Sequence, residues 1–81
     1  MATLKNEWVP LIITKEIIEQ KKELKKILLK YGVKDPEEIE KKIENGELPE
    51  HPTYEDFLSA LALKNNIEKM KKLVGELIEE I

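Results

Sequence analysis

The chain contains no cysteine and no arginine, and only 5% of its residues are aromatic. Without cysteine, neither a disulfide framework nor a thiolate metal site can stabilise the fold. Without arginine, the chain lacks the side chain that most often reads base edges in nucleic acids. Its three glycines are scattered at Gly32, Gly46 and Gly75, so it has no glycine-rich loop for binding phosphate.

Long apolar runs are also missing. A transmembrane helix needs about 20 apolar residues, whereas no apolar run in this chain, including Leu11–Ile13, comes near that length. The first residues do not show the basic-then-apolar pattern of a signal peptide. We therefore expect a cytoplasmic protein with no membrane partner.

What the chain has in abundance is charge. Charged residues make up 38% of its 81 residues, and all 14 basic side chains are lysine. A surface rich in Lys and Glu is common in proteins from thermophiles. Residues 1–34 hold eight lysines against four glutamates, whereas residues 35–56 hold nine acids against two lysines. This asymmetry favours attraction between segments of the chain.

The stretch from Thr53 to Ile81 organises the rest of the chain. Its later apolar residues recur at intervals of three and four, which is the pattern of a helical seam. These seam residues are Ile67, Met70, Val74, Leu77 and Ile81. We predict one long helix from Thr53, with a break at Asn65-Asn66 as the alternative, because Asn66 could cap a new helix.

Two further helices are predicted upstream. The first begins at a capping Thr14 and ends before Gly32, and Gln20 stands where an apolar residue would complete its buried stripe. The second is short, because Asp35-Pro36 forms a capping signal and Asn45-Gly46 ends it.

Residues 1–13 are predicted to form an extended apolar arm, because the β-branched residues near Pro10 suit a strand, but Pro10 cannot donate to a ladder and no second strand exists to pair with. Trp8 would anchor this arm across the helices. An edge strand completed by a second subunit is the alternative. The expected fold is therefore an all-α small helical bundle, with an arm over residues 1–13 and a single helical domain over residues 14–81.

A difference in length indicates a partner. The predicted first helix spans about 27 Å and residues 53–81 span about 43 Å, so the first helix cannot cover the whole seam. We expect a homo-oligomer or a partner helix on the interaction residues Trp8, Ile67, Met70, Val74, Leu77 and Ile81. A monomer whose last helix folds back at Asn65-Asn66 is the alternative.

Two candidate sites compete with this interpretation. His51 lies among Glu50, Glu55 and Asp56, but one imidazole among carboxylates lacks a metal-ligand spacing. Lysines recur between positions 21 and 26, yet their spacing is that of the solvent face of an amphipathic helix. We therefore expect no metal, cofactor, catalytic residue or small-molecule substrate.

The sequence thus favours a non-enzymatic helical interaction module that self-associates through its last helix. Two alternatives remain open at this stage. One is a small regulatory protein, antitoxin-like or linked to transcription, in which the lysines of the first helix contact nucleic acid. The other is a metal-binding protein or an enzyme that uses His51 and the acids beside it.

Overall fold

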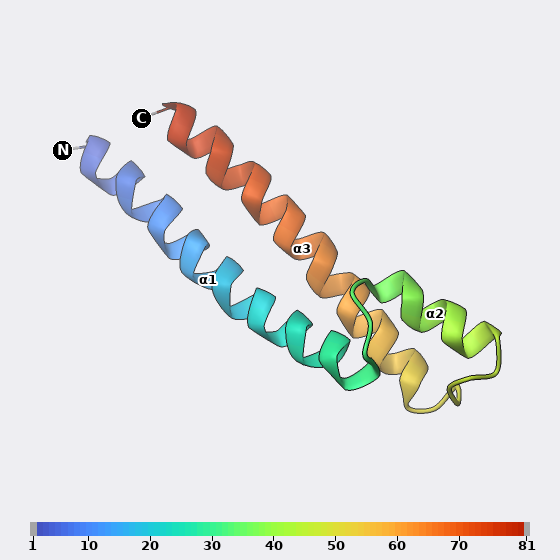
Figure 1. The fold of residues 1–81 in the computed structure, drawn as a ribbon. Helices are drawn as coiled ribbons and strands as arrows, with labels where there is room; N and C mark the ends of the chain where they lie inside the picture. Colours follow the sequence, from blue (N-terminus) through green and yellow to red (C-terminus); the bar gives the residue numbers. More distant parts are fainter. Residues whose placement is uncertain (1, 81) are drawn as a thin grey trace.

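The computed structural model describes the backbone of residues 2–80 and the side chains of residues 7–79. The chain forms three helices, α1 (Ala2–Tyr31), α2 (Pro36–Glu44) and α3 (Thr53–Glu80). α1 and α3 form a long antiparallel hairpin, and α2 lies against the first part of α3 (Figure 1). No strand occurs in residues 2–80, which confirms the predicted all-α fold.

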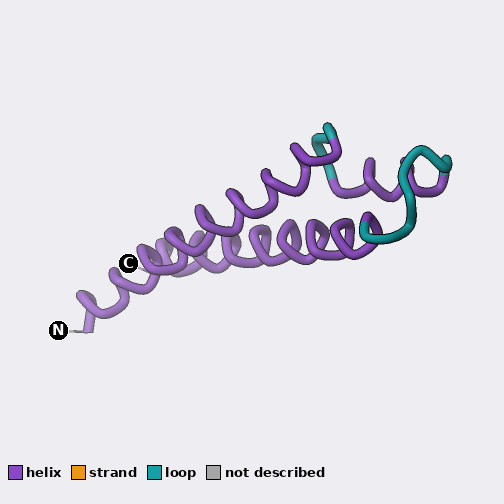
Figure 2. Tube along the Cα trace, turned by 90° about the horizontal axis from the view of Figure 1, so that it is seen from below, coloured by secondary structure: helices purple, strands orange, loops and turns teal. Residues whose placement is uncertain are grey.

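The hairpin is a rod with dimensions of 57 × 16 × 16 Å. We call the end where α1 begins and α3 finishes the open end, and the end that carries α2 the closed end. Figure 2 shows that the two long helices lie along each other, whereas α2 is confined to the closed end. Most of the hairpin is therefore only two helices thick.

α3 is continuous from Thr53 to Glu80, as predicted, and Asn65 and Asn66 are exposed positions within it. An asparagine in the middle of a helix has a low propensity but does not break it when it faces solvent. The alternative of a break at this point is therefore wrong.

The predicted extended arm is also wrong, because α1 already includes residues 2–13. Pro10 and Ile17 are buried and Ile13 is half-buried, so this part of the chain has a face that packs on α3. That burial outweighs the low helix propensity of β-branched residues and the loss of one backbone donor at Pro10. Thr14 does not cap a new helix, and its Oγ1 instead donates to the carbonyl of Pro10 at 2.7 Å.

The predicted difference in helix length disappears with this correction. α1 has 30 residues and α3 has 28, so both are about 40–45 Å long. α1 therefore lies beside the described part of the seam within one chain, and Ile67, Met70, Val74 and Leu77 need no second chain to meet a helix.

The closed end follows its local signals closely. Gly32 ends α1 with φ of 64°, a conformation that suits glycine, and the N–H of Val33 donates to the carbonyl of Leu28 at 3.0 Å. Asp35 caps α2 in a complete capping box with Glu38. α2 ends at Glu44, before Asn45-Gly46, as predicted.

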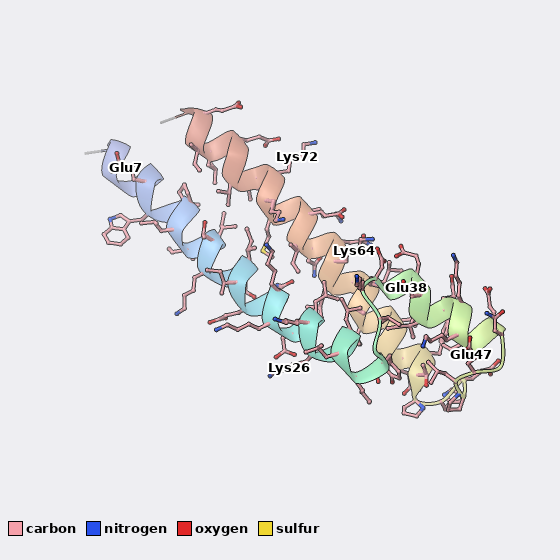
Figure 3. All side chains as sticks on the ribbon, in the orientation of Figure 1. Glu7, Lys26, Glu38, Glu47, Lys64 and Lys72 are labelled. Carbon is pink, nitrogen blue, oxygen red and sulfur yellow. The ribbon has the colours of Figure 1, made fainter. Side chains whose placement is uncertain are left out.

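α2 is held to α3 by apolar burial and by one lysine. Pro36 and Ile39 are fully buried where α2 meets α3. Lys64 of α3 reaches Asp35 Oδ2 at 3.2 Å and Glu37 Oε2 at 3.4 Å, and Figure 3 shows it beside the start of α2. A helix of nine residues is marginal alone, so this packing stabilises it.

A polar cluster joins the end of α1 to the start of α3. The Tyr31 hydroxyl donates to Asp56 Oδ2, and Lys30 Nζ donates to the same oxygen at 2.9 Å. The pKa of Asp56 is lowered below its ordinary value, mainly by the hydrogen bond from Tyr31 and secondly by the hydrogen bond from Lys30. The pKa of Tyr31 is raised, mainly by burial and secondly by its hydrogen bond to Asp56. The pKa of Lys30 is also raised, mainly by its hydrogen bond to Asp56.

We expect the free energy of unfolding to depend on pH through Asp56. Its lowered folded pKa contributes stability that is present above its unfolded pKa and is lost as the pH falls through the folded pKa. The raised pKa values of Tyr31 and Lys30 act oppositely, so their contribution is present at neutral pH and lost in strong base. Asp56→Asn should cost about 1 kcal/mol at pH 7 and progressively less in acid.

Urea unfolding of both proteins between pH 2 and pH 8 measures this difference. Glu68→Gln on the exposed side of α3 is the control and should stay within about 0.5 kcal/mol of the wild type throughout. A difference between Asp56→Asn and the wild type that does not shrink in acid would contradict the assignment.

A second prediction concerns Gln20, whose Oε1 is buried without a hydrogen-bond partner among the described residues. Its Nε2 donates only to the exposed Glu16 at 3.1 Å. Gln20→Leu should raise the free energy of unfolding by about 1–2 kcal/mol, because it removes an unpaired carbonyl and adds apolar burial. Chemical denaturation measures the change, and Gln20→Glu should destabilise instead. A leucine variant no more stable than the wild type would show that Oε1 is satisfied.

Candidate interaction surface

The open end carries most of the large apolar side chains that the described structure leaves exposed. Seven of ten such residues lie between positions 8 and 18 of α1 or in the last part of α3. We call these residues the collar: Trp8, Val9, Leu11, Ile12, Ile18, Leu73 and Ile78. The remaining three, Leu29, Tyr54 and Leu58, belong to the closed end.

The collar arises because α1 is apolar on more than one side near its start. Residues 8–14 contain no charged side chain, although 38% of the whole chain is charged. At 100° per residue, consecutive apolar residues spread around a helix, and α3 can cover only one side of it. Trp8, Leu11 and Ile12 are therefore 62–65% exposed.

The collar exposes a large apolar area in total. Seven large side chains, each exposing roughly half of about 200 Å², offer on the order of 700 Å². A stable interface takes about 800 Å² from each partner, and one interface covers only the part of the collar that faces one side of the rod. The collar contains no acid–base or nucleophilic group, so what it can do chemically is bury apolar surface.

The predicted interaction residues that the structure describes fall into two groups. Ile67 is buried, and Met70, Val74 and Leu77 are half-buried, on the side of α3 that packs on α1. Trp8 is 63% exposed, so it does not anchor an arm across the helices as predicted, and it belongs to the collar. Ile81 lies outside the described residues.

Sequence reasoning missed the rest of the collar, including Leu11, Ile18 and Ile78. Ile18 and Leu11 stand seven residues apart and share one line of α1, while Ile78 stands one residue after the seam residue Leu77. An apolar residue beside a seam position that is already filled is the signal that could have found them.

His51 lies at the closed end, beside a shallow pocket of about 350 Å³. Ile43 and Tyr54 line this pocket together with the carboxylates of Glu40, Glu44 and Glu50. His51 Nδ1 stands 3.4 Å from Glu55 Oε1, and both side chains are more than two-thirds exposed. The described residues contain no group of three His, Cys, Asp or Glu that could hold a metal ion, and the expectation of a protein without metal stays a prediction.

The lysines of α1 are exposed. Lys21, Lys22, Lys25 and Lys26 all face solvent, and Figure 3 shows Lys26 pointing away from α3. The ion pair between Lys26 and Glu23 is 3.8 Å long and largely exposed to water, so it contributes little to stability.

None of the described helices combines the length and the apolar composition that crossing a bilayer requires. The apolar residues of the collar are interrupted by Lys15 and Glu16 along α1.

Comparison with known proteins identifies relatives but no activity. No solved structure matches the chain. "Uncharacterized protein MJ0235" of Methanocaldococcus jannaschii is 35% identical over 66 residues, which cover 82% of this chain and 80% of the relative. This relative comes from a thermophilic archaeon, which agrees with the Lys- and Glu-rich composition. Residues 4–80 match the model of the Uncharacterized protein MJ0235 family, and the chain belongs to that family.

Proposed function

We propose that this protein is a non-enzymatic interaction module that self-associates through the collar. The observation that carries the proposal is the concentration of exposed apolar side chains at the open end, where the hairpin is only two helices thick. Burying apolar surface is the main favourable contribution to the association of proteins. A second copy brings an identical surface, so one interface satisfies both chains.

The proposal places the contact beside the seam rather than on it. Met70, Val74 and Leu77 already pack towards α1, so a partner meets them only at their exposed edges. Residues that are more than half exposed, such as Leu11 and Ile12 of α1 and Ile78 of α3, supply the contact instead. α3 contributes to the proposed interface through the side chains on either side of its seam.

Replacing collar residues with acids should dissociate the assembly. Leu11→Glu with Ile18→Glu should weaken self-association by at least about a hundredfold, because each copy then loses two buried apolar contacts and would bury two charges. Light scattering coupled to size exclusion, over a concentration series, gives the mass of each protein. Circular dichroism establishes that the variant remains helical.

The matched control is Leu29→Glu with Leu58→Glu, which changes the charge equally at exposed leucines of the closed end. We expect this control to assemble like the wild type. A wild-type protein that remains a monomer across the whole series would reject self-association. Equal weakening by both pairs of substitutions would show that charge, rather than the collar, governs assembly.

A further inference from the structure

Gly75 is a residue that the packing of the single chain does not explain. It lies inside α3, where glycine costs about 1 kcal/mol relative to alanine. A Cβ atom built at Gly75 would meet no described atom beyond its own helical turn within 4 Å, so nothing in the described part of the chain requires a glycine at this position. Glycine in a helix is also the residue that allows the closest approach of another helix backbone.

One side of α3, next to the seam, is covered by α2 at the closed end and is uncovered towards the open end. A step of seven residues returns a side chain to nearly the same direction on a helix. Lys64 contacts the start of α2, and the same line of side chains continues towards the open end at Lys71 and Ile78, where α2 does not reach. Ile78 is 57% exposed, so the position that α2 fills at the closed end is open beside Gly75.

The surface around Gly75 is complementary to itself in charge. Exposed residues at helical spacing surround Gly75, and they are Glu68, Lys71, Lys72, Ile78 and Glu79. Figure 3 shows Lys72 pointing away from α1. Among the described side chains, Lys71, Lys72 and Glu79 have no ion pair within the chain. Two copies of α3 that cross antiparallel at Gly75 place Lys71 and Lys72 of each copy near Glu79 of the other.

We propose that two copies of the chain associate through a two-fold axis beside Gly75, where their α3 helices cross antiparallel. This inference rests on the proposed self-association and adds the position and direction of the contact. The axis makes the interface isologous, so each ionic contact between Glu79 and the lysines occurs twice. Ile78 of each copy is buried beside the crossing, where the backbones come close.

A larger side chain at the crossing tests the inference. Gly75→Leu should raise the dissociation constant of the dimer at least about tenfold, because its side chain separates the two helices. Ala62→Leu is the matched control, since Ala62 is an exposed position of α3 remote from the crossing, and it should leave the constant within about twofold. Analytical ultracentrifugation over a concentration series measures both constants.

The outcomes separate the two proposals. A wild-type dimer that Gly75→Leu leaves intact would overturn the crossing, while self-association through the collar would stand. A wild-type monomer at all concentrations would overturn both. Weakening by Gly75→Leu but not by Ala62→Leu supports the crossing.

Exchange of charge supplies a second test that changes no packing at Gly75. Lys71→Glu with Lys72→Glu makes one copy acidic at the crossing, and Glu79→Lys makes another copy basic. Each variant alone should dimerise at least about tenfold more weakly than the wild type, because like charges then meet across the axis. An equimolar mixture should form a heterodimer with affinity near that of the wild type. A mixture that associates no better than its components would overturn the antiparallel crossing.

Discussion

The single contact between α1 and α3 is the constraint on which the rest of the structure depends. Two helices in contact bury one stripe each, and their flanks stay open unless a third element covers them. α2 covers one flank of α3 at the closed end, where Pro36 and Ile39 are fully buried. Elsewhere the seam stays half-open, and Met70, Val74 and Leu77 are all partly accessible to solvent. The closed end is therefore packed on the additional helix α2, whereas the open end exposes apolar side chains.

Local signals determine the closed end, and for that reason the sequence predicts it well. The cap at Asp35 and the left-handed conformation of Gly32 depend on residues that are close in the chain, so the sequence predicts them without knowledge of the tertiary structure. The period of the seam in α3 is equally local. Its continuity through Asn65-Asn66 was predictable because two exposed polar residues do not interrupt the apolar spacing on the other face.

The start of α1 could not be predicted in the same way, because its local and tertiary preferences conflict. Pro10 and the β-branched residues around it disfavour a helix, whereas burial of Pro10 and Ile17 against α3 favours one. The balance between helix propensity and burial depends on α3, which begins more than forty residues after Pro10 in the chain. An apolar residue beside a filled seam position indicates the collar, but which side of α1 remains exposed is known only after α3 has covered the other. Gly75 carries a weak local signal, a glycine within a helical pattern, but its surroundings require the fold.

The proposed assembly would couple the stability of this protein to its concentration. A chain of 81 residues buries a smaller fraction of its surface than a larger domain and is only marginally stable alone. Binding between folded copies stabilises them by mass action, because the unfolded chain cannot form the interface. The residues that weaken the isolated hairpin, namely the exposed collar and Gly75, would then be the ones that stabilise the dimer. The closed end, with its own capping box and polar cluster, would hold the register of the hairpin in both states.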